Sequence, residues 1–427
     1  MTKKQKITKI FLSGALFAAA LFLIPASAQA ATYYVSTSGS DSNAGSSSAP
    51  FKTIQKAANI VNPGDTVIVR DGTYTDTNND LNVVRLARGG TSSSSWITFK
   101  AENKWGAVLD GLGTAKFGWN LKAGSQYIRI EGFQIKNMTN AAFVMQKELS
   151  NHQNNIYIYR NKIYDIGRQI RGCSDPEVGI GHSGIGASYL VENLTVDSNE
   201  IYDIGRLSEC KTKEDYADPA KEGKCGCSLQ QDYSLDHGIY VGSQHTKIIN
   251  NVFYNCAAGW SIQVAGSVSP TTDWKIINNT FYGKNPVKVG QIVLWGYTND
   301  ITIQNNISHS AQTSFIHALD AEKKKSIKIN NNLVYGAEKV INTSGAEYQL
   351  SDNITGKDPK LVDLASRNFR LQSTSPAIDK GLYTSDRVYD ADGKLISGTP
   401  DIGAYEYGSS GSGDTTPPAP PTGLKVQ

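Results

Sequence analysis

The chain has no long apolar run after its first thirty residues, few cysteines and no strong excess of either charge. Nothing beyond residue 30 is long and apolar enough to span a membrane, so no membrane partner is expected. The formal net charge of +3 includes four lysines in residues 1–30, so the rest of the chain carries −1. Such a balance argues against nucleic acid as a partner and leaves charge recognition to local patches.

Both ends of the chain differ from its middle. Residues 1–30 have a basic start, an apolar stretch over Ile10–Ile24 and the small-residue site Ala28-Gln-Ala30. This pattern predicts a signal peptide, and hence a secreted, extracellular protein. Residues 408–421 form a Gly/Ser/Pro-rich linker, and residues 422–427 resemble the start of an incomplete fibronectin type III module. Residues 31–407 are therefore expected to form the main domain.

The chain has five cysteines, an odd number. In an oxidising compartment we expect Cys173 to pair with one of Cys210, Cys225 or Cys227. Cys256 is expected to be the free thiol, because it occupies a small buried position of the repeat described next. The spacing of Cys225-Gly-Cys227 does not suit a structural zinc site.

A repeat runs from about Tyr127 to Tyr335, and asparagine marks each copy. Mostly apolar residues lie five and three positions before the asparagine and two positions after it, an alternation typical of strands broken by a bend. The last spacings are 28, 27 and 26 residues. The marker residues are Asn161, Asn199, Asn251, Asn279, Asn306 and Asn332.

A strand-rich repeat of this length predicts an all-β fold, a single-stranded parallel β-helix in which the asparagines form an amide ladder. Crossover connections between parallel strands are nearly always right-handed, so the β-helix is expected to be right-handed. Before the first coil, residues 51–61 place Phe51, Ile54, Ala58 and Val61 on one helical face. This short N-terminal helix is expected to cap the open apolar end, and Ser375–Tyr407 to close the other.

Two insertions interrupt the repeat, over Gly167–Ile180 and Gly205–Leu235. Each leaves after a Tyr-Asp-Ile-Gly strand end, so both should project from one side on adjacent coils, and loops this long are usually functional. The strands that follow form a third face. Pointing its isoleucines inward (Ile185, Ile239, Ile262, Ile292 and Ile316) turns outward the residues Gly184, Gly186, Gly238, Tyr240, Ser261, Gln263, Gln291, Val293, Trp295 and His317.

The opening of the domain carries a resemblance. Tyr33-Tyr-Val-Ser, Pro50-Phe-Lys-Thr-Ile-Gln-Lys-Ala and Gly64-Asp-Thr-Val-Ile-Val-Arg-Asp-Gly-Thr-Tyr74 resemble the start of secreted right-handed β-helix proteins that act on acidic polysaccharides. Pectate lyases, chondroitinase-B-like enzymes and alginate lyases share it. The resemblance covers most of residues 32–407 as a fold and implies an acidic polysaccharide as partner, with the chain acting as a monomer.

The resemblance to each group differs. Pectate lyases of this type are associated with an aspartate-rich calcium site and a lysine base, whereas the third face has only Asp232 and Asp236 at its edge. Chondroitinase-B-like enzymes have a Lys/Arg pair and Asn/Glu calcium ligands in their coils, and we find no matching residues in this sequence. The chain is most similar to alginate lyases of polysaccharide lyase family 31. The expectation is therefore a lyase that requires no cofactor, with calcium possible and no metal ligands assigned.

The implied reaction is β-elimination, which needs the C6 carboxylate neutralised, a base for the C5 proton and an acid for O4. We expect Tyr240 and Lys221 to transfer the protons, with a nearby cation lowering the pKa of the tyrosine. His182, His237 and Arg171 are expected to bind or neutralise the carboxylate. Further substrate contacts are expected from Gln263, Gln291, Trp295 and His317.

Several alternatives stay open. Tyr240 could be an ordinary strand tyrosine, His237 could serve a turn, and Lys221 is one of several loop lysines that water could solvate. On the same fold, the chain could instead be a pectate lyase, a uronan C5-epimerase or a non-catalytic carbohydrate-binding β-helix.

Overall fold

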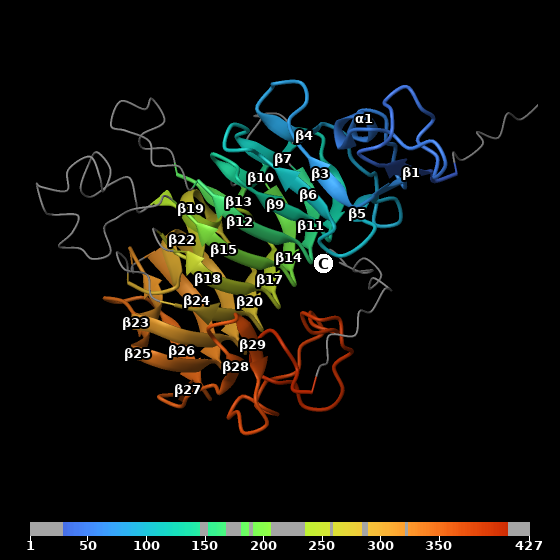
Figure 1. The fold of residues 1–427 in the computed structure, drawn as a ribbon. Helices are drawn as coiled ribbons and strands as arrows, with labels where there is room; N and C mark the ends of the chain where they lie inside the picture. The colour runs from blue at the N-terminus through green and yellow to red at the C-terminus, as the bar shows by residue number, and fades with distance from the viewer. Residues whose placement is uncertain are drawn as a thin grey trace, which may run out of the picture.

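The computed structural model describes residues 29–145, 153–167, 181–187, 191–205, 235–256, 259–283, 289–320 and 323–408. In this part of the chain, 27 strands form one sheet that winds into a stack of coils, as Figure 1 shows. The predicted all-β parallel β-helix is confirmed. Most of the predicted signal peptide and residues 409–427 lie outside the described residues. Within the described ranges, no helix is long and apolar enough to cross a membrane.

Three faces, here called A, B and C in chain order within a coil, make up the stack. Face A contains β1 (Thr32–Val35), β2 (Thr66–Val69), β5 (Ile97–Ala101), β8 (Gln126–Glu131), β11 (Gln153–Tyr159), β14 (Val191–Asp197), β17 (Thr246–Ile249), β20 (Trp274–Ile277), β24 (Lys324–Asn330) and β26 (Tyr348–Ser351). Face B contains β3 (Gly72–Tyr74), β6 (Ala107–Asp110), β9 (Gln134–Lys136), β12 (Lys162–Ile166), β15 (Glu200–Ile204), β18 (Val252–Cys256), β21 (Thr280–Tyr282) and β27 (Ile354–Thr355).

Face C is the third face of the sequence analysis. It contains β4 (Asn82–Leu86), β7 (Phe117–Leu121), β10 (Ala141–Met145), β13 (Ser183–Ala187), β16 (His237–Val241) and β19 (Ile262–Thr271). Three longer strands turn a corner: β22 (Ile292–Gln304) runs from face C to face A, whereas β23 (Ile307–Ala318) and β25 (Leu333–Asn342) run from face B to face C. Each coil therefore supplies one segment to every face.

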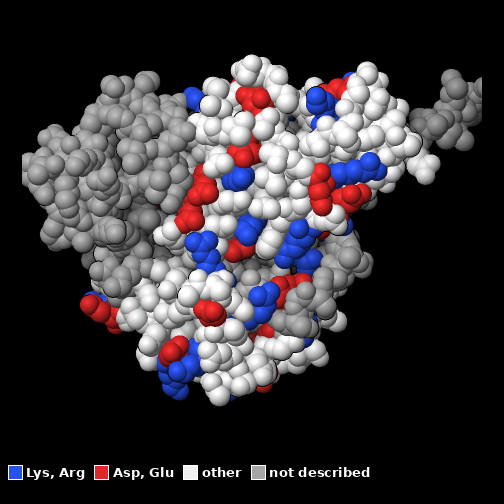
Figure 2. All heavy atoms as spheres, in the orientation of Figure 1, with Lys and Arg blue, Asp and Glu red and all other residues white. Residues whose placement is uncertain are grey.

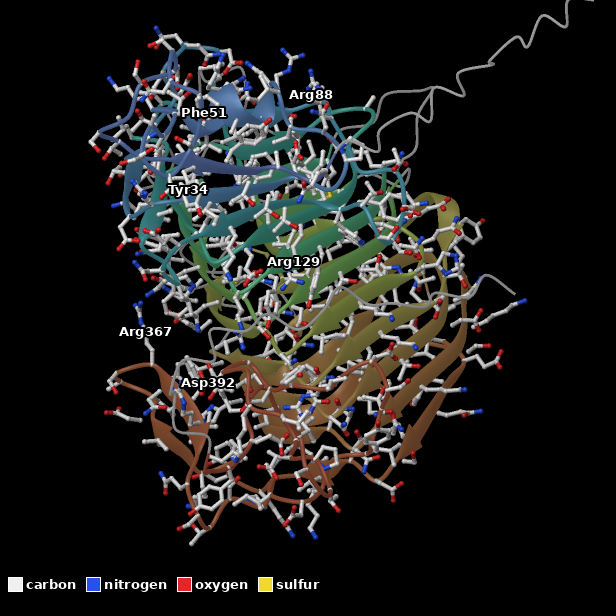
Figure 3. The ribbon with its side chains drawn as sticks, turned by 90° about the vertical axis from the view of Figure 1, so that its right-hand side faces the viewer. Tyr34, Phe51, Arg88, Arg129, Arg367 and Asp392 are labelled. Carbon is white, nitrogen blue, oxygen red and sulfur yellow. The ribbon has the colours of Figure 1, made fainter. Side chains whose placement is uncertain are left out.

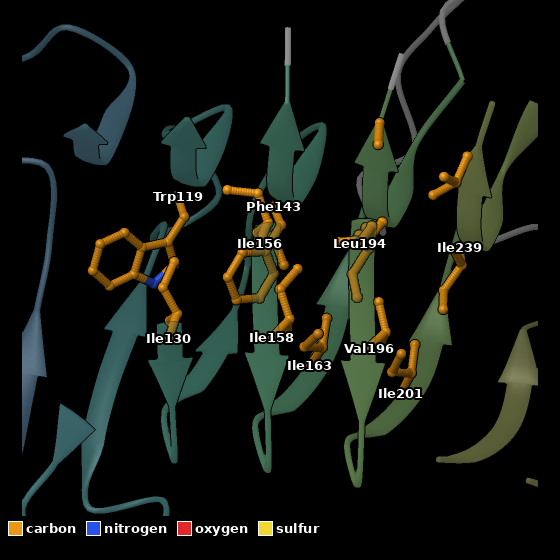
Figure 4. Packing of buried hydrophobic residues seen from close by; sticks show 14 of the residues in the cluster. Trp119, Ile130, Phe143, Ile156, Ile158, Ile163, Leu194, Val196, Ile201 and Ile239 are labelled. Atoms are coloured by element: carbon orange, nitrogen blue, oxygen red, sulfur yellow. The ribbon is translucent and has the colours of Figure 1, made fainter. Parts of the chain in front are cut away.

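Apolar side chains fill the inside of the stack. Figure 4 shows rows in which each residue lies over its equivalent in the next coil, such as Ile130, Ile158 and Val196. Phe253 and Phe281 stack with ring centroids 4.9 Å apart. Because β-branched and aromatic side chains pack well on a pleated surface, the alternating apolar residues of the repeat both form the strands and bury their inner face.

The asparagine ladder is confirmed at the corner between faces A and B. Asn251 donates from Nδ2 to the Asn279 Oδ1 at 3.0 Å, and its backbone N–H donates to the same oxygen at 2.9 Å. The pattern repeats from Asn161 to Asn332, and Asn353, which the sequence analysis missed, adds a further rung. Each amide satisfies backbone groups that the bend withdraws from the strand ladder.

Left-handed backbone corners, which the sequence analysis also missed, explain the tight coil. In one coil they fall five residues apart, at His245, Asn250 and Asn255, with φ of 52°, 57° and 53°. Asparagine, aspartate and glycine tolerate this conformation and occupy most of the equivalent positions. The same five-residue spacing occurs at 127/132/137, 155/160/165, 193/198/203, 273/278/283, 300/305/310 and 326/331/336.

The N-terminal cap has the predicted buried face but a shorter helix. α1 spans only Ile54–Ala58, and the Thr53 hydroxyl caps it by accepting from the Lys56 N–H at 3.1 Å. Phe51, Ile54, Ala58 and Val61 are all buried. The flanking residues therefore continue the apolar cover without helical backbone.

The C-terminal segment, residues 357–408, lies along the side of the stack. It contains the antiparallel pair β28 (Leu361–Asp363) and β29 (Asn368–Leu371). Asp386 binds Lys247 and Lys275 of face A at 2.7 and 2.6 Å. The Asn278 amide donates to backbone carbonyls of this segment, and Arg387 donates to Asn250 Oδ1 at 2.6 Å. This segment therefore follows the corner between faces A and B.

Candidate functional site

The outward side of face C is continuous over several coils. The inward positions of its five isoleucines are confirmed, since all are fully buried. On the other side, the register places in one row Gly186, Tyr240, Gln263, Val293 and His317. Because stacked strands lie about 4.8 Å apart, the row rises in regular steps along the helix axis. Its side chains differ in exposure: His317 is half-buried, Gln263 is largely buried and Val293 is fully buried, which corrects the prediction of an outward Val293.

Tyr240 is the exposed aromatic residue of this row, with 36% of its surface accessible. Its ring stacks on that of His237, with centroids 5.4 Å apart and planes 17° apart. Within the described residues its hydroxyl has no hydrogen-bond partner, and burial raises its pKa above the usual value. The expectation of a lowered pKa was wrong for this environment, because no described cation offsets the loss of hydration. Tyr240 is therefore protonated at neutral pH.

His237 is fully buried and lies between two rings. Trp260 stacks near it at 5.7 Å, and the Trp260 backbone N–H donates to His237 Nδ1 at 3.2 Å. A nitrogen that accepts this hydrogen bond carries no proton, so the ring is neutral with its proton on Nε2. The His237 ring therefore packs beneath Tyr240, and its expected role in binding or neutralising the substrate carboxylate stays a prediction.

A second histidine pairs with a buried carboxylate. His182 Nδ1 lies 2.9 Å from Asp236 Oδ1, and the His182 backbone N–H donates to the same oxygen at 3.0 Å. The His237 N–H in turn donates to the His182 carbonyl at 2.8 Å. The pair thus links the starts of β13 and β16. The sequence analysis placed Asp236 only at the edge of the face, although the adjacent Asp-His sequence was a usable signal.

The glycines near Tyr240 differ from the prediction. A Cβ at Gly184 would lie 3.2 Å from Ile201 Cγ2, and one at Gly238 would lie 3.2 Å from Cys256 Sγ. These two glycines therefore turn toward the packed corner, and they leave no room for a ligand. At Gly186 the nearest obstacle is the Ser183 hydroxyl at 2.9 Å, the end of a small side chain. Gly186, the register neighbour of Tyr240, is the one of these three glycines that is half-buried and not fully buried.

The four expected substrate-binding residues occupy different environments. Gln263 lies beside Tyr240 and is largely buried, while Trp295 and His317 are half-buried on later coils. Gln291 corrects the prediction of an outward side chain. Its amide donates to the Gly283 and His309 carbonyls at 3.1 Å each and accepts from the Ser308 hydroxyl at 2.8 Å. Gln291 therefore joins faces B and C.

Both insertions fall largely outside the described residues. Lys221 and Arg171 lie there, as do Cys173, Cys210, Cys225 and Cys227 with their expected disulfide. Cys256 is a free, buried thiol as predicted, and burial raises its pKa to about 12. Within the described ranges, no three His, Cys, Asp or Glu side chains gather into a candidate metal site.

Comparison with known proteins agrees with this architecture. Residues 33–203 match the family model described as the Pel9A-like, right-handed β-helix region. The fold is a right-handed parallel β-helix. The predicted hand and the expected resemblance are thus confirmed.

Two individual proteins are similar to the chain. Pectate lyase PEL9 of Emericella nidulans is 37% identical over 82 residues, which are 19% of this chain and 19% of that protein. The match therefore spans about a fifth of the curated relative. The crystal structure of an alginate lyase from Paenibacillus sp. str. FPU-7 aligns with a TM-score of 0.53 and 18% identity, covering 71% of this chain and 92% of that one. At this identity the likeness concerns the fold.

Proposed function

We propose that this protein is a polysaccharide lyase that cleaves an acidic uronan by β-elimination. The observation that carries the proposal is Tyr240, an exposed tyrosine whose ring is held on a buried His237–Trp260 stack at an outward row of face C. A phenol fixed by its ring, with a hydroxyl that makes no contact in the described residues, suits proton transfer to a bound ligand.

The protonated state of Tyr240 favours the role of acid. In β-elimination a base removes the C5 proton, the C4–O4 bond breaks as the C4–C5 double bond forms, and the departing O4 takes a proton. Because its pKa is raised, the phenol is almost entirely un-ionised at neutral pH, so little phenolate is present to act as base, whereas the phenol can donate its proton to the much more basic alkoxide-like oxygen. We assign this step to the Tyr240 hydroxyl.

The other steps require groups from the insertions. We propose Lys221 as the base and Arg171 as the cation that neutralises the C6 carboxylate, since a nearby positive charge stabilises the developing enolate. His182, oriented by Asp236, is proposed to assist in binding the carboxylate. His237 is a positioning residue in this scheme. Gln263, Trp295 and His317 are proposed to contact sugar along face C.

Alginate is the substrate we favour. The pairing of a tyrosine with a lysine-rich insertion supports elimination without a required metal, and the aspartate-rich calcium cluster associated with pectate lyases has no counterpart in the sequence of face C. The fold likeness to an alginate lyase agrees with this choice. A secreted monomer acting on an extracellular uronan would also be consistent with the predicted signal peptide.

A lyase screen tests the proposal. The protein is incubated with alginate, polygalacturonate and glycosaminoglycans, with and without a chelator, and the ultraviolet absorbance of unsaturated uronate is followed. We expect alginate to give the fastest rise, unchanged by the chelator. A faster rise on polygalacturonate would replace the substrate assignment. Epimerised product without absorbance, or binding without chain shortening, would overturn the lyase assignment.

A further inference from the structure

A second group of residues points to a ligand away from Tyr240. It lies where face B meets the corner with face A, on the side covered further along by the C-terminal segment. Figure 2 shows Lys and Arg side chains, interspersed with Asp and Glu, in the middle of this side of the molecule. We call the group the basic seam and define it as Lys104, Trp105, Arg160, Lys162 and Arg367.

Two seam residues occupy backbone positions that suit other residue types. The column of left-handed corners next to the asparagine ladder contains Gly132, Ser198, Asn250, Asn278, Asn305, Asn331 and Asp352. At two levels the column instead contains Trp105 and Arg160, with φ of 68° and 53°. Bulky side chains pay a steric cost in this region, and such outliers concentrate at binding and active sites. These two also touch, because Trp105 Nε1 donates to the Arg160 carbonyl at 2.8 Å.

Arg160 supplies an independent observation. It is only 7% exposed, and its Nε and Nη2 atoms have no hydrogen-bond partner in the described structure. The guanidinium lies over the Tyr159 ring, with its Cζ 5.0 Å from the ring centroid, and packs against Gly393 of the C-terminal segment. Two buried guanidinium nitrogens without an acceptor are costly even though the Asp197 carboxylate lies near this charge, and a further anionic acceptor at this point would remove that cost.

The neighbouring cations also contact rings. Lys104 Nζ and Lys162 Nζ lie 4.3 and 4.9 Å from the Trp105 ring centroid. In the described residues, neither lysine has a carboxylate within salt-bridge distance. Partial loss of hydration lowers the pKa of Lys104. The positive charges of Arg160 and Arg370 lower it further, whereas the negative charges of Asp392 and Glu200 raise it. The cations are therefore crowded, and cation–π contacts of about 0.5–1 kcal/mol hold them only weakly.

The nearest acidic groups are already engaged. Asp392 accepts two hydrogen bonds from Arg370, at 2.8 and 2.7 Å, and Glu200 accepts from the Tyr254 hydroxyl at 2.7 Å. Arg367 extends the seam along the axis, over the rings of Tyr202 and Tyr254 at 5.1 and 4.9 Å, and its Nη2 lies 3.9 Å from Asp203 Oδ2, a long and partly exposed ion pair. Figure 3 shows Arg367 and Asp392 at one edge of the molecule, with Arg367 pointing from the C-terminal segment toward the earlier coils.

We propose that the basic seam is a second, non-catalytic binding site for a carboxylated polysaccharide chain. Its cations are spread over several coils, each about 4.8 Å from the next, which suits a linear polyanion with carboxylates at regular intervals. Aromatic rings between the cations suit the apolar faces of sugar rings. The ligand class rests on the proposed function, but the site lies on a different face from Tyr240 and its test does not depend on catalysis.

Affinity electrophoresis in gels containing alginate or polygalacturonate tests the seam, with dextran as the neutral polymer. All variants carry Tyr240→Phe, so that cleavage does not shorten the polymer. We expect Lys104→Gln/Lys162→Gln to weaken binding on the order of tenfold, because two charge-assisted contacts are lost. The matched control Lys325→Gln/Lys328→Gln removes two exposed lysines of β24 and should bind like the parent. Dextran should not retard any variant.

Arg160→Asn sharpens the test because it inserts the residue type that the corner column prefers. We expect its melting temperature to equal or exceed that of the parent, while polyanion binding weakens several-fold. A seam double variant that binds both polymers like the control pair, or a parent that binds neither, would overturn the proposal. Lyase assays on the unmodified chain separate the outcomes: lost binding without any lyase activity supports the seam and contradicts the proposed function.

Discussion

Asn251 and Tyr240 lie on adjacent coils, and the protein uses their polar atoms differently. The Asn251 amide donates to the Val196 and Ile249 carbonyls and to Asn279, and it accepts from Asn199. The Tyr240 hydroxyl has no partner in the described residues, although its ring is packed. At the asparagine corner the polar atoms are used by the protein. At face C the ring is packed, and the hydroxyl is the atom that we propose as the proton donor.

This difference separates residues that hold the coil from residues that act on a ligand. A polar atom that the protein already satisfies stabilises the fold, and its removal leaves buried groups unpaired. A polar atom held in place but left without a protein partner can be removed with little structural cost. The comparison therefore predicts a loss of activity without a loss of stability at one site, and the reverse at the other.

Tyr240→Phe should give the largest effect. The ring and its stacking on His237 remain, so stability should be unchanged, while elimination falls by about 10²–10⁴-fold, as is usual for loss of a general acid. Initial rates of unsaturated uronate formation and a thermal melt measure the two quantities. Tyr297→Phe is the matched control, since Tyr297 is another exposed tyrosine and its variant should keep full activity. Near-normal turnover of the Tyr240 variant would remove Tyr240 from the mechanism.

Asn279→Ala should be the most destabilising change at the corner. It removes an acceptor from the Asn251 N–H and donors from the Ile248 and Ile277 carbonyls, all buried. The expected cost is about 2–4 kcal/mol in the free energy of unfolding, because several buried groups lose partners. Denaturant unfolding measures it.

Asn353 provides the comparison within the ladder. It is half-buried at the last rung, where water can replace part of what is lost, so Asn353→Ala should cost only about 1 kcal/mol. Equal losses at the two positions would show that burial does not determine the strength of a rung. Lyase activity of both folded variants should match that of the parent.

The coil could be predicted because its physical causes are periodic in the sequence. Asparagines 26–28 residues apart, with apolar residues at fixed offsets, specify the ladder and the inward rows, and the structure contains both. The left-handed corners were missed, although Asp273, Asn278 and Gly283 show their signal as a five-residue spacing of residues that tolerate positive φ. Both features recur at fixed spacings, so both can be recognised in the sequence.

The site could be predicted only in part. Strand alternation correctly turned Tyr240 outward, but it fails at the corner, where Gly184 and Gly238 face the packed interior. The neutral state of His237 depends on the backbone N–H of Trp260, and the burial of Gln291 depends on carbonyls from face B. These contacts arise from the way coils stack, and no local pattern encodes them. The insertion residues Lys221 and Arg171 remain predictions.

Asp386→Asn should cost less stability than Asn279→Ala, and it extends the comparison to a contact that occurs once. Asp386 ties the C-terminal segment to face A through Lys247 and Lys275, and its side chain is 11% exposed. Burial opposes its ionisation, but the hydrogen bonds and charges of the two lysines lower the net pKa below its usual value. Because the folded-state pKa lies below the unfolded value, of about 3.9, the contact stabilises the fold at neutral pH. That contribution decreases as the pH falls below about 4.

The asparagine variant should therefore lose about 1–2 kcal/mol in the free energy of unfolding at pH 7, because the loss of one partly exposed carboxylate leaves two lysines without their charged acceptor. The difference between variant and parent should shrink as the pH falls through the folded-state pKa, because protonation removes the same charge from the parent. Denaturant unfolding of both proteins at several pH values measures this. The Asn279→Ala difference provides the contrast: an amide does not titrate, so that difference should persist at low pH. A deficit at Asp386 that stayed constant with pH would mean that packing of the segment, and not the ion pairs, holds it on face A.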